Sequence, residues 1–505
     1  MDGLSLLVQG LVFVTSWESL FNIAWATLLG IVIGTLPGLT ATMGVALMVT
    51  LTYKMGADQA ILVLLCMYIG AIYGGSRTAI LLNIPGTPAS AATALDGYPL
   101  AMKGQAGYAM GLATTGSAIG TIVGIFCLAL VAPLLAEVAF SFGSYEFFWL
   151  ALFGIVISGT LTSPGDPLKG YIAGILGLLV AMIGAESLHG FYRFTFDLQP
   201  LAGGIGLIPA MVGAFGFAEI LTVMKRNRKA IVATAVDRVL PPLRDVWRNK
   251  VNFIRSGVVG TFVGVIPGVG EDIGAWGSYA AARRYSKKPE EYGKGSTEGL
   301  TAAETGNSAV VPGALIPALT LAIPGSAPAA VLLAALFIHG VRPGPMIMLE
   351  SPQFVYQVVA ILLLATLAIA IFGLSLTRLF VLVLRIPRER LMPIVYVLCI
   401  IGPFAITQRL FDIYVMIAFG VIGFVLREMK FPMAPIVLGL ILGTLLDKSL
   451  RRGLLLTDGD PTPFFTRPVS AGIAALTALT ILFSIPVVQR RASKLFRRAP
   501  SNPSA

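Results

Sequence analysis

The chain has 505 residues, of which 56% are hydrophobic and 12% are charged, and its mean hydropathy is +0.85. A soluble domain averages about 25% charged residues, so this composition excludes a water-covered globular protein and indicates a polytopic protein in a lipid bilayer. The net charge of +11 lies in loops, where the Lys and Arg excess of cytoplasmic segments explains it without a nucleic-acid partner.

Apolar stretches predict an all-α fold with about twelve transmembrane helices, because roughly 20 apolar residues are enough to span a bilayer. In chain order they lie near residues 17–36, 59–82, 106–140, 145–163, 168–185, 201–224, 253–270, 309–338, 354–384, 411–426, 431–446 and 469–488. The segment from Met1 to Ser16 has no Lys or Arg, so it does not resemble a cleaved signal peptide, and we expect the first span to be retained.

Two basic segments divide the chain. Cytoplasmic loops of membrane proteins are rich in Lys and Arg, and residues 225–255 and 489–505 both have this character. We therefore expect a first transmembrane repeat at 1–224, a cytoplasmic linker at 225–255, a second repeat at 256–488 and a cytoplasmic tail at 489–505.

The two predicted halves share a pattern of glycines and prolines. Gly30, Gly34, Pro37, Gly38 and Gly44 each precede an identical residue by 230 positions, namely Gly260, Gly264, Pro267, Gly268 and Gly274. Further along, we pair Gly75-Ser76 with Gly306-Asn307, and Ile84-Pro85-Gly86 with Ile323-Pro324-Gly325 after a small insertion. The first half starts from an uncharged N-terminus and the second from a basic linker, so loop charge predicts two inverted repeats.

Each Pro-Gly motif breaks a helix inside the membrane or makes it re-entrant. Pro removes a backbone donor and Gly relaxes the backbone, so a break frees N–H groups that attract anions and carbonyls that bind cations. Breaks at matching places in two halves indicate the binding site of a transporter. The alternatives are a kink that serves packing and Ser or Thr side chains that join helices.

The candidate residues lie in and around these breaks. For the substrate they are Pro37, Gly38, Thr40, Ser76, Asn83, Pro85, Gly86, Thr87, Pro267, Gly268, Asn307, Ser308, Pro324, Gly325 and Ser326. For a coupling ion they are Thr42, Asn83, Glu304 and Asn307.

Arg77 is a separate candidate, because a charged residue within a membrane segment is costly and is by default a functional hypothesis. Its guanidinium could hold a substrate carboxylate through two hydrogen bonds. Alternatively, Arg77 lies near a helix end and its charged group reaches the membrane interface.

Several motifs are absent from the sequence. It contains no P-loop for ATP, no G-x-S-x-G and no H-E-x-x-H, so we predict neither an enzyme nor a bound cofactor. The three cysteines are far apart and do not form a metal or disulfide pattern. The energy for transport must come from an ion gradient or from another subunit.

Two other classes stay open, a channel-like anion permease and an intramembrane hydrolase. A hydrolase would need a pair of carboxylates, and the adjacent Glu271 and Asp272 would point about 100° apart on one helix.

Long motifs carry a resemblance to a known family. The sequence has GTLPGL at 34–39, YGGS at 73–76, NIPGTP at 83–88 and DGYPL at 96–100 in the first half. The second half has VIPGVG at 265–270, ETGNS at 304–308 and IPGS at 323–326. With these motifs, the chain resembles the large membrane subunit of the tripartite tricarboxylate transporter family over residues 10–490.

The resemblance implies import of citrate or other di- and tricarboxylates across a bacterial inner membrane by symport, with Na⁺ as the expected coupling ion and H⁺ as the alternative. It also implies two partners, a small membrane subunit of about four helices and a periplasmic solute-binding protein. We therefore expect a secondary active transporter whose substrate lies between the Pro-Gly breaks of the two halves.

Overall fold

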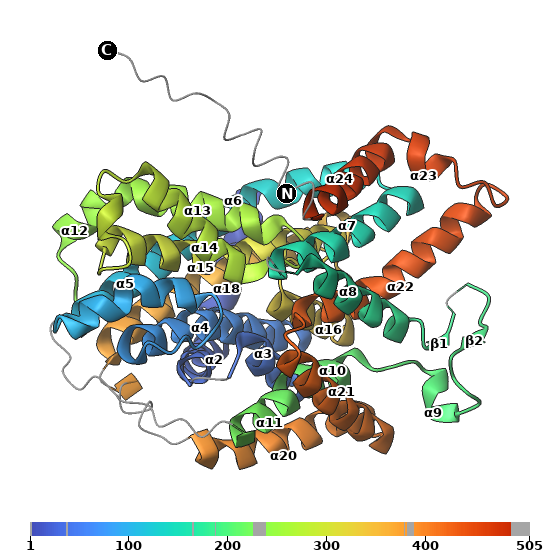
Figure 1. Cartoon of the computed structure of the whole chain (residues 1–505), viewed down its shortest axis with the longest axis horizontal. Coiled ribbons are helices and arrows are strands. Elements are labelled where there is room, and N and C mark those ends of the chain that lie inside the picture. The colour runs from blue at the N-terminus through green and yellow to red at the C-terminus, as the bar shows by residue number, and fades with distance from the viewer. Residues whose placement is uncertain are drawn as a thin grey trace. The chain divides into compact units, whose positions relative to one another are not determined.

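The computed structural model describes residues 3–36, 39–163, 166–186, 188–225, 239–377, 379–380 and 388–485 (Figure 1). Three of the sequence predictions fall outside these residues. They concern the break residues Pro37 and Gly38, the part of the linker at 226–238 and the tail at 489–505.

The chain divides into two compact units, one made of residues 1–141 and 205–428 and the other of residues 142–204 and 429–505. Each unit thus combines segments that lie far apart in the sequence. The broken helices predicted from the sequence all belong to the first unit.

The first unit is built of helices around two buried ones, α4 and α15. In chain order its elements are α1 (Gly3–Val14), α2 (Trp17–Thr35), α3 (Ala41–Thr52), α4 (Ala57–Leu82), α5 (Ser90–Met102), α6 (Ala106–Ala139), α10 (Leu207–Met211), the π-helical segment η1 (Val212–Phe217), α11 (Ala218–Lys225), α12 (Leu243–Arg248), α13 (Lys250–Val265), α14 (Gly270–Tyr285), the 3₁₀ turn η2 (Pro289–Glu291), α15 (Thr297–Leu321), α16 (Ala327–Ile338), α17 (Ile347–Glu350), α18 (Pro352–Ser375), α20 (Arg388–Thr407) and α21 (Leu410–Glu428).

The second unit is a smaller helical group. Its elements are α7 (Ser144–Thr162), α8 (Pro167–Ala181), the antiparallel strands β1 (Gly184–Ala185) and β2 (Tyr192–Arg193), α9 (Gln199–Ala202), α22 (Met433–Leu455), α23 (Pro463–Thr466) and α24 (Pro468–Ser484). Helix α22 packs against α7 and α8. An ion pair of 2.9 Å between Arg193 and Asp447 joins the strand pair to α22.

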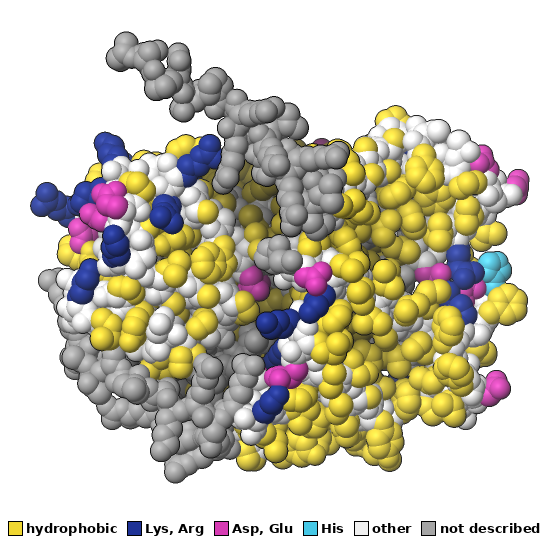
Figure 2. All heavy atoms as spheres, in the orientation of Figure 1, with side chains coloured by type: hydrophobic (Ala, Val, Ile, Leu, Met, Phe, Trp, Pro, Cys, Tyr) yellow, Lys and Arg dark blue, Asp and Glu magenta, His cyan; other side chains and the backbone are white. Residues whose placement is uncertain are grey.

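Eight helices among the described residues are long and apolar enough to cross a membrane. They are Trp17–Thr35, Ala57–Leu82, Ala106–Ala139, Ser144–Thr162, Leu207–Lys225, Pro352–Ser375, Leu410–Glu428 and Met433–Leu455. Figure 2 shows hydrophobic side chains over much of the visible surface, with Lys and Arg gathered near α12, α13 and α14. The architecture is that of an all-α, multi-pass membrane protein.

The Pro-Gly motifs interrupt helices where the sequence predicts. Helix α4 ends at Leu82 and α5 begins at Ser90, while α15 ends at Leu321 and α16 begins at Ala327. Asn83 and Ala322 end the two longer helices in the left-handed conformation, with φ of 53° and 56°. Shorter interruptions separate two further helix pairs: α13 ends at Val265 and α14 begins at Gly270, while α2 ends at Thr35 and α3 begins at Ala41.

Corresponding helices of the two halves pack alike. A Cβ atom built on Gly34 of α2 would overlap the Ala71 carbonyl of α4, and one built on Gly264 of α13 would lie 2.6 Å from the Val310 carbonyl of α15. Gly34 and Gly264 are 230 residues apart, and Ala71 and Val310 are 239 residues apart. Helices α2 and α4 therefore contact each other as α13 and α15 do, with backbones so close that only glycine fits.

This packing corrects the predicted alignment of Gly75-Ser76 with Gly306-Asn307. At the offset of 239 residues between α4 and α15, Ser76 corresponds to Leu315 and Asn307 corresponds to Tyr68. The nine extra residues of the second half (239 minus 230) lie between α14 and α15, before Asn307. The prediction was wrong because glycines are frequent in both helices and coincide at more than one register.

The close approach of α13 to α15 predicts a specific loss of stability. Gly264→Ala should destabilise the folded chain by about 1–3 kcal/mol, because the added methyl group meets backbone atoms of α15 that cannot move aside. The measurement is the midpoint of thermal unfolding of the purified protein. Gly277→Ala on α14 is the matched control, since its nearest atom lies 3.9 Å from the new Cβ. Equal midpoints for both variants would contradict this packing.

Candidate functional site

The two breaks of the second half contact each other. The backbone N–H of Gly268 donates to the Pro324 carbonyl at 3.2 Å, and that of Gly270 donates to the Gly325 carbonyl at 3.1 Å. Gly268 and Gly270 have φ of 71° and 70°, a conformation that glycine adopts without strain. Backbone groups that the breaks free from their helices are thus satisfied between the breaks.

A hydroxyl group accepts a backbone N–H at the start of α16, α5 and α3, whereas α14 begins after Val269 without a side-chain cap. Ser326 Oγ accepts from the Ala329 N–H, and Thr87 Oγ1 accepts from the Ser90 N–H, both at 3.3 Å. Thr40 Oγ1 caps α3 by accepting from the Met43 N–H at 3.2 Å. The candidates Thr40, Thr87 and Ser326 therefore all lie at helix N-termini, where the helix dipole favours negative charge.

Tyr68 of α4 connects the first half to the breaks of the second half. Its hydroxyl donates to the Glu271 carboxylate at the start of α14 and lies 2.7 Å from Ser326 Oγ. All three side chains are buried. Tyr68 has no local signal in the sequence, because its partners are 203 and 258 residues away.

Glu304 of α15 receives hydroxyl groups from three helices of the first half. Ser76 of α4 donates to its carboxylate at 2.6 Å, Ser117 of α6 donates at 3.1 Å, and Thr93 of α5 donates to the other oxygen. All four side chains are buried, and Glu304 is completely so. Two candidates, Ser76 and Glu304, thus lie together, whereas Ser117 carried no signal in the sequence.

Arg77 is completely buried, so the alternative in which its side chain reaches the membrane interface is wrong. Its Nη2 donates to Thr114 of α6 and to the Gly373 carbonyl of α18, both at 3.0 Å. The guanidinium also lies 4.8 Å from the ring centre of Tyr73. These contacts fix α6 and α18 against α4, and a role in holding substrate stays a prediction.

Asn307 and Ser308 follow Glu304 on α15 and are also buried. Neither the Nδ2 nor the Oδ1 atom of Asn307 has a hydrogen-bond partner among the described residues, and Ser308 Oγ has none either. A buried polar group without a partner costs about 1–3 kcal/mol. A fully buried amide in this state therefore calls for a ligand or another explanation.

The remaining candidates differ in exposure. Asn83 and Pro85 are exposed at the end of α4, while Gly86, Pro324 and Gly325 are buried. Asn83 occupies the left-handed cap position that Ala322 takes in the second half, and Asn tolerates that conformation better than most residues. Thr42 is buried in the first turn of α3.

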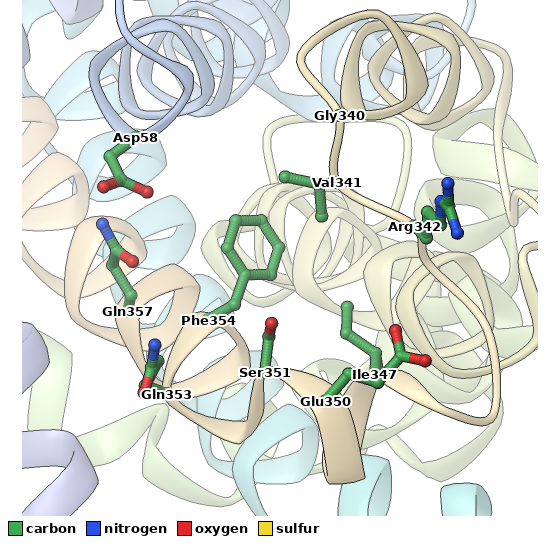
Figure 3. A pocket seen from close by; sticks show the side chains of 10 residues that line it. All are labelled: Asp58, Gly340, Val341, Arg342, Ile347, Glu350, Ser351, Gln353, Phe354 and Gln357. Carbon is green, nitrogen blue, oxygen red and sulfur yellow. The ribbon is translucent and has the colours of Figure 1, made fainter.

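A cavity of about 470 Å³ lies apart from the candidate residues (Figure 3). Its lining comes from the start of α4, from the chain between α16 and α18 and from the first turns of α18, and includes Asp58, Arg342, Glu350, Phe354 and Gln357. Figure 3 shows these side chains around an open centre. None of the predicted site residues lines it.

Comparison with known proteins gives consistent matches. The model of a family described as the tripartite tricarboxylate transporter TctA family matches residues 20–438. An uncharacterised 52.8 kDa protein in the TAR-I ttuC' 3' region of Agrobacterium vitis is 36% identical over 486 residues, which cover 94% of this chain and 95% of that protein. An uncharacterised protein in the TAR-II ttuC' 3' region of Agrobacterium vitis is 32% identical over 238 residues, or 47% of this chain and 98% of that protein. No solved structure matches the chain.

The contacts of Arg77 predict a structural effect. Arg77→Gln should lower the free energy of unfolding by about 1–3 kcal/mol, because the Thr114 hydroxyl and the Gly373 carbonyl lose a charged donor. The thermal unfolding midpoint measures this change. Arg427→Gln, which removes a partly exposed ion pair with Glu219, serves as the control and should cost less. A buried guanidinium that can be removed without loss of stability would contradict the role assigned here.

Proposed function

The chain belongs to the tripartite tricarboxylate transporter TctA family, and on that basis we propose that it imports di- or tricarboxylates such as citrate, driven by an ion gradient. In this proposal it is the large membrane subunit of a binding-protein-dependent secondary transporter. The family is one of transporters and not of enzymes.

This proposal rests on contacts between the two halves at the helix breaks. Tyr68 of the first half contacts Ser326 in a break of the second half. In the other direction, the Asp272 carboxylate of α14 accepts a hydrogen bond from the Ala89 N–H, directly before α5. A substrate held here would touch both halves, as a mechanism of alternating access requires.

We also propose that the halves are inverted repeats. Helices α4 and α15 correspond to each other in sequence, and two contacts relate their directions. Ser76 of α4 meets Glu304 early in α15, whereas Tyr68, earlier in α4, meets Ser326 beyond the end of α15. Opposite directions of equivalent helices support an inverted arrangement, within the expected set of about twelve spans.

Coupling to a cation is supported by the buried charges. Glu271 and Glu304 are buried carboxylates, and none of the ion pairs among the described residues involves either of them. Arg77 is a buried cation whose described hydrogen bonds go to neutral groups. An organic anion with two or three negative charges would meet strong repulsion in this region unless cations entered with it. We propose Na⁺ as that cation and Glu304 with its hydroxyl groups as a place where it binds.

The proposed partners are a small membrane subunit of about four helices and a periplasmic solute-binding protein, in a bacterial inner membrane. The tripartite character of the family supports the existence of further subunits. The binding protein would select the substrate and deliver it to the membrane subunits.

Uptake of labelled citrate into proteoliposomes that contain all three components tests this function. We expect an inward Na⁺ gradient to drive uptake, and Glu304→Gln to raise the Na⁺ concentration for half-maximal uptake about tenfold or more, because a charged ligand is lost. Glu298→Gln is the control, since Glu298 lies on the first turn of the same helix and bonds Ser286. Citrate uptake that saturates with substrate concentration but does not depend on any cation gradient would contradict coupling to a cation. Citrate flux that does not saturate would favour a channel.

A further inference from the structure

The second half contains its own carboxylate at a pair of helix N-termini. Glu271 lies in the first turn of α14, and its carboxylate accepts from the Tyr68 hydroxyl. Ser326, the N-cap of α16, hydrogen-bonds to the same carboxylate. These residues, Glu271, Tyr68 and Ser326, form what we call the second corner. Its geometry suits a carboxylate, with two hydroxyl donors and two helix N-termini around it.

The offsets between the halves identify the equivalent residues of a first corner. Ala41, the first residue of α3, lies 230 residues before Glu271 and is its counterpart in the first half. At the offset of 239 residues, Asn307 is the counterpart of Tyr68, and Thr87 is the counterpart of Ser326. Thr87 and Ser326 also make the same capping bond. The first corner thus repeats the donors and the helix ends but lacks a carboxylate.

Asn307 is placed to reach this corner. Thr93 of α5 contacts Glu304, and a Cβ on Gly97 would lie 3.4 Å from Leu300, so α5 runs antiparallel to α15. Asn307 lies about one turn after Glu304 on α15. Because α5 runs in the opposite direction, Asn307 is therefore beside the start of α5, where the Thr87 hydroxyl accepts from the Ser90 N–H.

Among the described residues, the donors of the first corner have no acceptor. Asn307 is completely buried, and no described residue hydrogen-bonds to either atom of its amide. The Thr87 hydroxyl accepts from the Ser90 N–H, and no bond that it donates is found among the described residues. Asn is also shorter than the Tyr that fills the equivalent place in the second corner. The first corner thus has donors at the positions that bind the Glu271 carboxylate in the second corner, but it contains no carboxylate of its own.

We infer that a carboxylate of the substrate binds in the first corner, in the position that the Glu271 carboxylate takes in the second. Asn307 Nδ2 and the Thr87 hydroxyl donate to it, and the N-termini of α3 and α5 provide favourable partial charge. This inference rests on the proposed function and deepens it, since it assigns Asn307 to the anion and not to the coupling ion. The second corner is unable to take a second carboxylate, because Glu271 already occupies it.

Asn307→Leu distinguishes a ligand site from a structural role. The variant removes a buried amide that has no partner, so the substrate-free protein should unfold at the same temperature as the wild type or higher. The KM for uptake should rise about tenfold or more, because a hydrogen bond to a charged group is worth about 1.5–3 kcal/mol. Asn307→Ala gives the same test with a smaller side chain. A lower unfolding temperature together with an unchanged KM would overturn the inference.

Ala41→Glu tests the position from the opposite side. A carboxylate introduced there would take the position that the Glu271 carboxylate has in the second corner and would compete with the substrate, so the KM for uptake should rise about tenfold or more while the protein still folds. Thr52→Val is the control and should leave KM unchanged, because Thr52 lies at the far end of α3, where its hydroxyl donates to the Met48 and Val49 carbonyls of the same helix. Wild-type KM in Ala41→Glu would contradict the assignment.

The probes are labelled succinate, malate and citrate, and the variants are compared on the one that the complete wild-type transporter takes up fastest. If the wild type takes up none of them under any cation gradient, the proposed function fails. If the wild type takes up one of them and the Asn307 and Ala41 variants have the same KM as the wild type, the proposed function stands, but the assignment of the first corner as a carboxylate site is wrong.

Discussion

Lipid cannot hydrogen-bond to a broken helix, and the arrangement of the first unit follows from this constraint. Every break frees backbone groups, so the breaks must lie against protein. The second-half breaks bond to each other through Gly268 and Gly270, and the hydroxyl groups of Thr87 and Ser326 accept backbone N–H groups at the starts of α5 and α16. Close packing of α2 on α4 and of α13 on α15 brings the breaks together, and glycine makes that packing possible.

The two halves share a backbone plan but differ in chemistry. The second half provides Glu271 and Glu304 to the buried region, while the corresponding positions of the first half are Ala41 and Leu65. The first half provides hydroxyl groups, among them Ser76 and those of α5 and α6 that meet Glu304. In the proposed transporter this difference separates the two kinds of ligand, since donors without an acceptor suit an anion and buried carboxylates suit a cation.

The breaks were predictable from the sequence because Pro and Gly act on the backbone where they stand. The register between the halves was not predictable from the sequence, because Gly75 aligns with Gly306, which is not its counterpart in the structure. The contacts of Gly264 with α15 were needed to correct the alignment. The partners of Tyr68 lie 203 and 258 residues away, and the hydrogen-bond partners of Arg77 lie 37, 296 and 300 residues away, so no local pattern reports them. Asn307 was a candidate from its motif, but only the structure shows that its amide is buried without a partner among the described residues.

The decisive measurement is a cryo-electron microscopy structure of the substrate complex in a lipid bilayer, with the partner subunits and saturating substrate. We expect density for a carboxylate within hydrogen-bonding distance of Asn307 and Thr87, at the start of α3 and α5. Substrate density in the cavity lined by Asp58 and Glu350, with the first corner empty, would contradict it.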